Sequence, residues 1–289
     1  MNYTPKKPIG TNARGEKPHP DSALSGRKLF TPVLWFFSVF FLSTARVSGE
    51  ETFAWRSILQ AAFGAGERIV YTVKYGALAG GAASQEIIGV EDMGGRKAFH
   101  IVSEAQSNKT FSAVLKVRER RDSWMDAQSL SSLKLVEDLK EGSYERKSET
   151  RVDPAQGRLA YTYKTKKHHG TNDIAVDPFI QDSVSLVYYL RTLPLEAGKS
   201  YDVPLHLGGN AHVARIRVKG VEKIKVPAGS FECYHLIPAI VGEAKSDWSL
   251  EVWLTTDLRR LPVLLKSKIA VGSFTARMSD FIPGTTDAK

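Results

Sequence analysis

Two histidines, His206 and His212, flank a Gly208-Gly209 turn, and their type and spacing could form a metal-binding pair. A two-residue glycine loop pairs Leu205 with His212 and His206 with Ala211, which keeps the apolar residues of both strands on one face. Pairing the two histidines would need a three-residue loop, and Leu205 would then turn to the opposite face. The hydrophobic pattern therefore separates the histidines, and we expect no metal site here.

The adjacent pair His168-His169 lies in a basic segment, residues 164–170. Adjacent strand residues point to opposite faces, so the two rings do not form a natural chelate. We interpret the segment as a solvated basic hairpin, with contact to anionic lipid headgroups as the alternative.

The single cysteine, Cys233, excludes an intramolecular disulfide and any multi-cysteine zinc site. It shares a strand face with His235, but no Asn or Asp partner is identifiable, so we predict a buried small hydrophobe. Carboxylates are numerous, and their spacing singles out no acid–base pair. The Gly-x-Ser-x-Gly, His-Glu-x-x-His, P-loop and Gly-x-Gly-x-x-Gly motifs are absent. The sequence identifies no catalytic residue, metal or cofactor, which makes an enzyme the less favoured interpretation.

The charge of the chain is concentrated at its start. The 289 residues are 42% hydrophobic and 25% charged, which is typical of a globular protein, and the net charge is +9. Residues 1–49 hold seven Lys and Arg against two Asp and Glu, a net of +5, which leaves +4 for the other 240 residues. Such a mixed, mildly basic remainder does not indicate nucleic-acid binding.

Residues 1–49 have the pattern of an export signal. A long polar, basic leader precedes the apolar stretch 29–42, and small residues follow, with Val47 and Gly49 suited to cleavage before Glu50. The alternative is an uncleaved membrane anchor, since 17 residues separate Lys28 from Arg46. Either reading predicts an extracytoplasmic protein in the periplasm or beyond, with membrane contact only through this segment if it is retained.

In the rest of the chain, apolar and polar residues alternate as in β-strands. We expect a lead-in helix at residues 50–65, one β-rich domain at 66–283 without a clear internal repeat, and a disordered tail at 284–289. Polar alternation favours antiparallel pairing, and a sheet of this size curls. The prediction is a mainly β fold, a large curved antiparallel sheet (barrel, half-barrel or sandwich) with one or two helices. The strands are expected at residues 69–75, 82–90, 98–105, 116–125, 131–139, 144–152, 158–164, 200–207, 211–221, 229–237, 250–255, 262–271 and 274–280.

The main helix is expected between Asp177-Pro178 and Leu193-Pro194, where it could cover the concave side of the sheet. Five residues on and beyond it are candidates for ligand binding. Gln181 and Asp182 could reach a cavity or cap the helix, and Arg191 could bind an anionic headgroup or pair with a carboxylate. Tyr188 and Trp253 could line an apolar cavity or simply pack.

Several segments together resemble an exported bacterial family, domain of unknown function 3108: GERIVY (66–71), LKEGSY (139–144), QDSVSLVYYLR (181–191), VPAGSFEC (226–233), VWLTTDLRRLPV (252–263) and IAVGS (269–273). The resemblance spans about residues 66–281. It implies a mostly β envelope protein and assigns no reaction or catalytic residue. The general plan is also similar to the curved-sheet lipoprotein carriers of bacterial envelopes.

Three functions remain open. The first is non-enzymatic binding of a lipid or other apolar ligand on the concave side of the sheet. The second is a structural or interaction protein of an envelope assembly, and the third is a hydrolase acting on envelope polymer. The packing between the helix and the sheet, hollow or filled, is the feature that discriminates the first two.

Overall fold

The computed structural model describes residues 53–242, 249–269 and 272–285. The chain divides into two units, residues 1–51 and 52–289, and the fold below is that of the second. The signal or anchor predicted for residues 1–49 lies outside the described residues. Within the described ranges, no helix has the length and apolar character that crossing a bilayer requires.

All fourteen strands of the described residues belong to one antiparallel sheet, which confirms the predicted fold class. Their order across the sheet is β8-β7-β6-β5-β4-β3-β2-β1-β14-β13-β12-β11-β10-β9. The helix α1 spans Ser185–Leu190, and a 3₁₀ turn spans Phe111–Ala113. The strands are β1 (Arg68–Tyr75), β2 (Leu78–Asp92), β3 (Lys97–Ser107), β4 (Val117–Asp126), β5 (Ser132–Glu141), β6 (Tyr144–Asp153), β7 (Arg158–Thr165), β8 (His169–Ala175), β9 (Ser200–Leu207), β10 (Asn210–Val226), β11 (Gly229–Ile240), β12 (Ser249–Thr255), β13 (Pro262–Ile269) and β14 (Gly272–Ile282).

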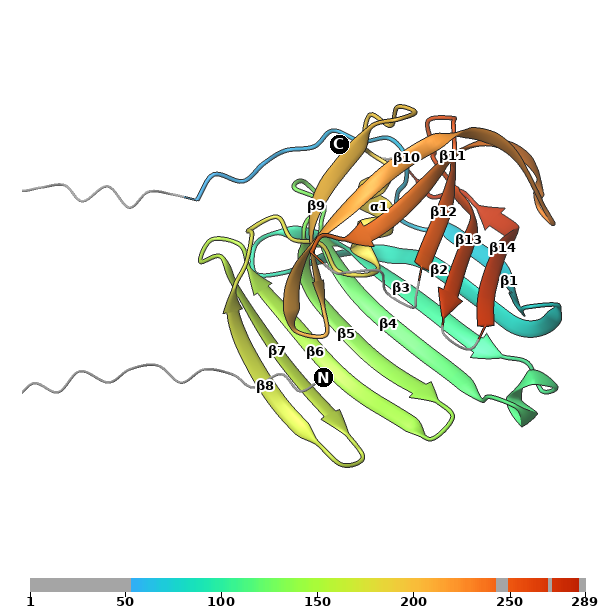
Figure 1. Cartoon of the computed structure of the whole chain (residues 1–289). Coiled ribbons are helices and arrows are strands. Elements are labelled where there is room, and N and C mark those ends of the chain that lie inside the picture. Colours follow the sequence, from blue (N-terminus) through green and yellow to red (C-terminus); the bar gives the residue numbers. More distant parts are fainter. Residues whose placement is uncertain (1–52, 243–248, 270–271, 286–289) are drawn as a thin grey trace, which may run out of the picture. The chain divides into compact units, whose positions relative to one another are not determined.

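The sheet curves around α1, with β2–β8 on one side and β9–β13 on the other (Figure 1). Val184 and Tyr188 pack against apolar side chains of β2–β5, whereas Leu186 and Leu190 pack against β9–β12. The residues of each pair are spaced i, i+4, so one face of the short helix packs against each part of the sheet. We call the sheet face that meets α1 the inner face.

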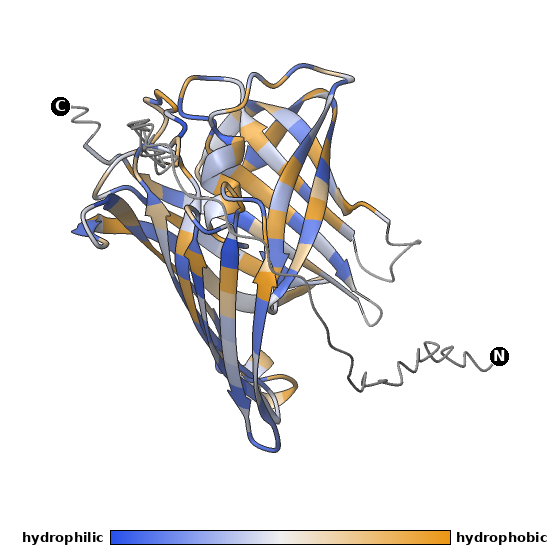
Figure 2. Cartoon of the chain, turned by 90° about the vertical axis from the view of Figure 1, so that its left-hand side faces the viewer, coloured by the Kyte–Doolittle hydropathy of each residue, from blue (hydrophilic) through white to orange (hydrophobic). Residues whose placement is uncertain are grey.

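Hydrophobic and hydrophilic residues alternate along the strands, as Figure 2 shows. The β9–β10 ladder pairs Ala211 with His206 and His212 with Leu205, which confirms the predicted two-residue turn and the separation of the histidines. Cys233 is fully buried, as predicted, and burial raises the pKa of its thiol to about 12.

The lead-in helix predicted for residues 50–65 is wrong over its described part. Residues 53–64 carry no helix, because their polar groups bond to another segment: the Ile58 amide donates to the Gln128 carbonyl (2.9 Å), and Arg56 Nε donates to the Ser129 carbonyl (2.7 Å). Phe63 is buried in the inner-face core, while Leu59 is 98% exposed. Tertiary contacts thus decide the conformation of a segment too short to hold a helix by itself.

The main helix is much shorter than predicted. The Gln181 amide donates to the Pro204 carbonyl (2.9 Å), and the His206 amide donates to the Gln181 carbonyl (2.8 Å), in a parallel bridge to β9. Gln181 therefore bonds to the edge of the sheet, and the helix begins only at Ser185.

Strand β8 and the C-terminal residues also differ from the prediction. The sequence missed β8, whose residues are mostly polar and exposed. The tail predicted for residues 284–289 begins with an ordered contact, since the Thr285 amide donates to the Ala65 carbonyl (2.8 Å). Residues 286–289 lie outside the described residues.

Candidate functional site

A pocket of about 470 Å³ lies on the inner face, where the segment before α1 and the β9–β10 turn approach strands β2–β6. Strand alternation places its polar residues beside the inner-face core: Gln85 follows the side of Ile87, and Ser103 follows the side of Ile101. Its polar lining comprises Gln85, Ser103, Arg121, Glu137, Arg146 and Ser183, and Val184, Leu207 and Gly208 complete the wall.

A network centred on Glu137 forms one side of the pocket. The Glu137 carboxylate, 8% exposed, accepts hydrogen bonds from Arg121 Nε (3.3 Å), Arg146 Nη2 (3.0 Å) and Ser148 Oγ (2.8 Å). Arg121 Nη1 also donates to Glu119 (2.6 Å). Burial works against the charge of Arg121, but Glu119 and Glu137 outweigh it and raise the pKa of its guanidinium. The network therefore places two guanidinium groups against the carboxylates of Glu137 and Glu119. A third carboxyl, Glu141, lies beside Glu119, and burial together with Glu119 raises its pKa.

The β9–β10 turn closes another side of the pocket by lying directly against β7. A Cβ on Gly209 would stand 2.3 Å from Cδ1 of Tyr161, and the φ of Gly209 is +79°, so this position needs glycine. Asn172 Nδ2 of β8 donates to the Gly209 carbonyl (2.8 Å). The turn and its Leu207 and Gly208 are thereby held in place by the opposite part of the sheet.

His206, which precedes this turn, is 1% exposed, and its Nε2 has no hydrogen-bond partner among the described residues. Burial lowers the pKa of its imidazole, while the carboxylates of Asp182 and Glu137 act in the opposite direction. The ring is accordingly a neutral buried group behind the pocket.

The lowered pKa of His206 makes stability depend on pH. In the unfolded chain an imidazole titrates at about 6.5, so just below that pH the unfolded state binds more protons than the folded state. We expect the free energy of unfolding to fall as the pH drops below about 6.5, and His206→Gln to flatten that fall. Thermal unfolding between about pH 5 and 7.5 measures it. The control is His212→Gln, and an equal flattening in both variants would contradict the assignment.

The five candidate residues predicted from the sequence are all buried, and none of them lines the pocket. Gln181 Nε2 donates to the Leu130 carbonyl (2.7 Å). Asp182 Oδ2 accepts from Ser123 Oγ (2.7 Å) and Ser132 Oγ (2.6 Å), and its Oδ1 accepts from the first amides of the α1 turn. Both side chains fasten the segment before α1 to the sheet.

The other three candidates are also held by contacts within the protein. Arg191 forms a two-pronged ion pair with Glu67 (2.5 and 2.8 Å). The ring of Tyr188 meets Phe63 edge-on with centroids 5.1 Å apart, and burial raises the pKa of its hydroxyl. Trp253, 3% exposed, donates through Nε1 to Glu222 (2.6 Å). The candidate site is therefore the pocket lining, to which none of the five residues belongs.

Comparison with known proteins agrees with this fold. A family model described as "Protein of unknown function (DUF3108)" matches residues 70–279. The chain belongs to the DUF3108 family. No curated protein matches it. Among solved structures, the DUF3108 chain is similar to the "Beta-barrel-like Protein of Domain of Unknown Function DUF1849 from Brucella abortus". That match has a TM-score of 0.51 and 9% identity and covers 78% of this chain and 100% of the other, so it bears on the fold alone.

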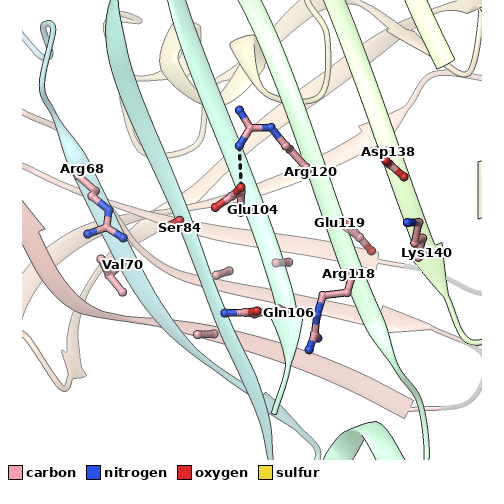
Figure 3. Close-up of a pocket in the computed structure, with 13 residues that line it drawn as sticks. Arg68, Val70, Ser84, Glu104, Gln106, Arg118, Glu119, Arg120, Asp138 and Lys140 are labelled. Atoms are coloured by element: carbon pink, nitrogen blue, oxygen red, sulfur yellow. Dashed lines mark hydrogen bonds and ion pairs between the residues drawn. The ribbon is translucent and has the colours of Figure 1, made fainter. Parts of the chain in front are cut away.

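A second pocket, of about 380 Å³, lies over β1–β5 of the DUF3108 chain (Figure 3). Most of its labelled side chains belong to the face opposite the inner one, and Arg120 pairs with Glu104 across two strands (2.7 Å). Both of those side chains are about half exposed. An exposed ion pair of this kind is typical of a solvated charged face, so we do not take this pocket as the site.

Sequence reasoning missed the polar lining of the inner-face pocket. Residues 118–122 read Arg-Glu-Arg-Arg-Asp, which is charged on both faces of β4. A pattern of this kind cannot show that Arg121 points inward. The only usable signal was the interruption of an apolar face in β5, where Glu137 stands between Leu135 and Leu139.

Proposed function

We propose that this DUF3108 chain is a non-enzymatic binding protein of the bacterial envelope that holds a polar ligand in the inner-face pocket. The observation that carries the proposal is the polar lining itself, built from side chains of five neighbouring strands beside the apolar side chains that pack against α1. Few, precisely placed polar groups in a concave site are typical of ligand recognition. The basic leader and apolar stretch of residues 1–49 support export.

The packing around α1 supports a polar ligand over a lipid. Val184, Leu186, Tyr188 and Leu190 are each less than 10% exposed and fill the space between the helix and both parts of the sheet. A lipid chain beside the pocket's guanidinium and carboxylate groups would remove water from them without replacing its hydrogen bonds. The apolar ligand expected from the sequence is therefore replaced in our proposal by a polar one.

Native mass spectrometry of the protein purified from the envelope fraction of its own host tests the proposal. We expect a bound mass that disappears after unfolding and refolding. Recovery of ligand-free protein, or its recovery from the cytoplasmic fraction alone, would count against the proposal.

The filled space around α1, together with a sheet edge, favours an interaction protein as the second candidate. Strand β8 ends the sheet order, and among the described residues its main chain forms a ladder only with β7. Such an edge can accept a strand from a partner. Crosslinking in the envelope from a photoreactive residue at Thr171 distinguishes the candidates, because a specific crosslinked partner combined with an empty pocket favours this alternative.

A further inference from the structure

The tripeptide Gly-Val-Glu occurs twice, at residues 89–91 and 220–222, and the structure places both copies identically. Each follows a β-bulge, between Ile87 and Gly89 in β2 and between Val218 and Gly220 in β10. In each copy the glycine pairs with a histidine on the next strand, Gly89 with His100 and Gly220 with His235. The internal repeat that the sequence did not reveal is therefore present.

The first histidine is the centre of a cluster that spans four strands. His100 Nδ1 lies 2.7 Å from Glu91 and its Nε2 lies 3.0 Å from Asp122. The ring stacks on Trp124 with centroids 4.2 Å apart and planes at 21°. Trp124 Nε1 donates to Glu91 (2.7 Å), and Lys134 Nζ lies 4.8 Å from the indole centroid.

The second histidine has the same surroundings. His235 Nδ1 lies 3.0 Å from Glu222 and its Nε2 lies 2.5 Å from Glu251. The ring stacks on Trp253 with centroids 4.2 Å apart and planes at 20°. Trp253 Nε1 donates to Glu222 (2.6 Å), and Lys266 Nζ lies 4.9 Å from the indole centroid. Four of these groups thus recur at the same register positions: the glutamate, the histidine, the acidic partner of Nε2 and the tryptophan. A lysine near the indole recurs on the corresponding strand but at a different position, since Lys134 pairs with Trp124 and Lys266 pairs with Glu251.

The backbone around the clusters repeats as well. The turn before β1 has Gly66 at φ +84°, and the turn before β9 has Gly198 at φ +83°. Gly66 donates to the Ile87 carbonyl (2.7 Å), and Gly198 donates to the Val218 carbonyl (2.8 Å). In both β4 and β12 the register shifts directly after the tryptophan.

These matches divide the sheet into two equivalent halves, β1–β6 and β9–β14, with β7, β8 and α1 between them in the chain. A hydrogen-bonded ladder joins β14 to β1. At the corresponding junction, from β6 to β9, the described residues form no such ladder, because β7 pairs with β6 and Gln181 bridges to β9. The inner-face pocket lies at this junction, since Arg146 comes from β6 and Leu207 from β9.

A comparison of the equivalent halves shows which polar residues of the pocket the fold does not require. The pocket pair Gln85 and Ser103 corresponds to Ile216 and Pro238 in the second half. Likewise Arg121, which pairs with Glu137, corresponds to Leu250, which pairs with Ser267. Ile216 is fully buried in the apolar core and Leu250 packs against it. The same sheet therefore accepts apolar or small residues at these positions.

We propose that the first half has specialised this pocket, at the junction the repeat leaves open, for a neutral, hydroxyl-rich ligand such as a sugar. This rests on the proposed binding function. The lining offers donors at Gln85, Ser103 and the two guanidinium groups, and acceptors at Glu137 and the hydroxyls. A sugar hydroxyl both donates and accepts. An isolated anion would face Glu137, and an isolated cation would face Arg121 and Arg146.

Calorimetric titration of the full chain tests the ligand class, with glucose, N-acetylglucosamine, maltose, inorganic phosphate and laurate as separate probes. We expect saturable binding of at least one saccharide. The double variant Arg121→Leu/Glu137→Ser copies the second half and removes both partners of one ion pair. It also leaves Glu119 and Arg146 without these partners, so we expect a lowered melting temperature, a cooperative unfolding transition and at least tenfold weaker binding.

The matched control is Arg120→Leu/Asp138→Ser, the same exchange at the neighbouring cross-strand pair of β4 and β5 on the opposite face. It should keep full saccharide affinity. Phosphate or laurate binding that only the inner-face variant abolishes would overturn the ligand class and leave the binding function standing. Saccharide binding that survives in both variants, or no binding of any probe together with an empty protein from the host, would overturn the proposal.

Discussion

Replacing Arg191 with alanine should lower the free energy of unfolding by about 3–5 kcal/mol, the usual cost of breaking a buried ion pair from one side. Arg191 is 1% exposed and joins three segments: Nη1 and Nη2 bind Glu67, Nη2 also donates to the Ala62 carbonyl (2.7 Å), and Nε donates to the Arg259 carbonyl (2.9 Å). The variant leaves the Glu67 carboxylate buried without its counter-ion. Urea unfolding followed by tryptophan fluorescence measures the loss.

The double variant Glu67→Met/Arg191→Met is the control for that result. It removes both charges while keeping similar volume, so it should cost less than Arg191→Ala despite altering two positions. A cost of under about 1 kcal/mol for Arg191→Ala, or a double variant less stable than Arg191→Ala, would contradict the role of this pair as a stabilising buried ion pair.

Much of the fold could be predicted because alternation is a local property. Strands such as β1 and β9 carry apolar residues at every second position, and the two-glycine turn after Leu207 fixes one register. The errors came from non-local contacts. Ile58 and Gln181 lie in segments with helical spacing, yet their main-chain groups bond to Gln128 and to β9, which no local pattern reveals.

The candidate site could be predicted only in part, because the sequence indicates where a helix meets a sheet but not which polar side chains face inward. For Asp182 and Arg191 the sequence left helix capping and a carboxylate pair open beside ligand binding, and both side chains are engaged within the protein. The sequence did not single out Arg121 or Glu137, and only the curvature of the sheet brings them beside Ser183. The repeat escaped notice for a related reason: Gly-Val-Glu is too short to be significant until its two copies are seen in the same register.

Replacing Trp253 with alanine should lower the free energy of unfolding by about 3–5 kcal/mol, as is usual for deleting a buried aromatic side chain. Trp253 is 3% exposed and packs in a cluster with Leu264. The alanine variant lacks both the stack on His235 and the hydrogen bond to Glu222. Chemical unfolding of the full chain measures the cost.

The equivalent residue in the first half provides the comparison that gives this experiment its meaning. Trp124 has the same histidine stack and the same glutamate bond, but it is only partly buried. Trp124→Ala should therefore cost less than Trp253→Ala. The same order should hold for Trp124→Phe and Trp253→Phe: each loses about 1 kcal/mol with its hydrogen bond, and Trp253→Phe also leaves a cavity in a buried cluster. Equal costs at the two positions, or a larger cost at Trp124, would contradict this difference in burial.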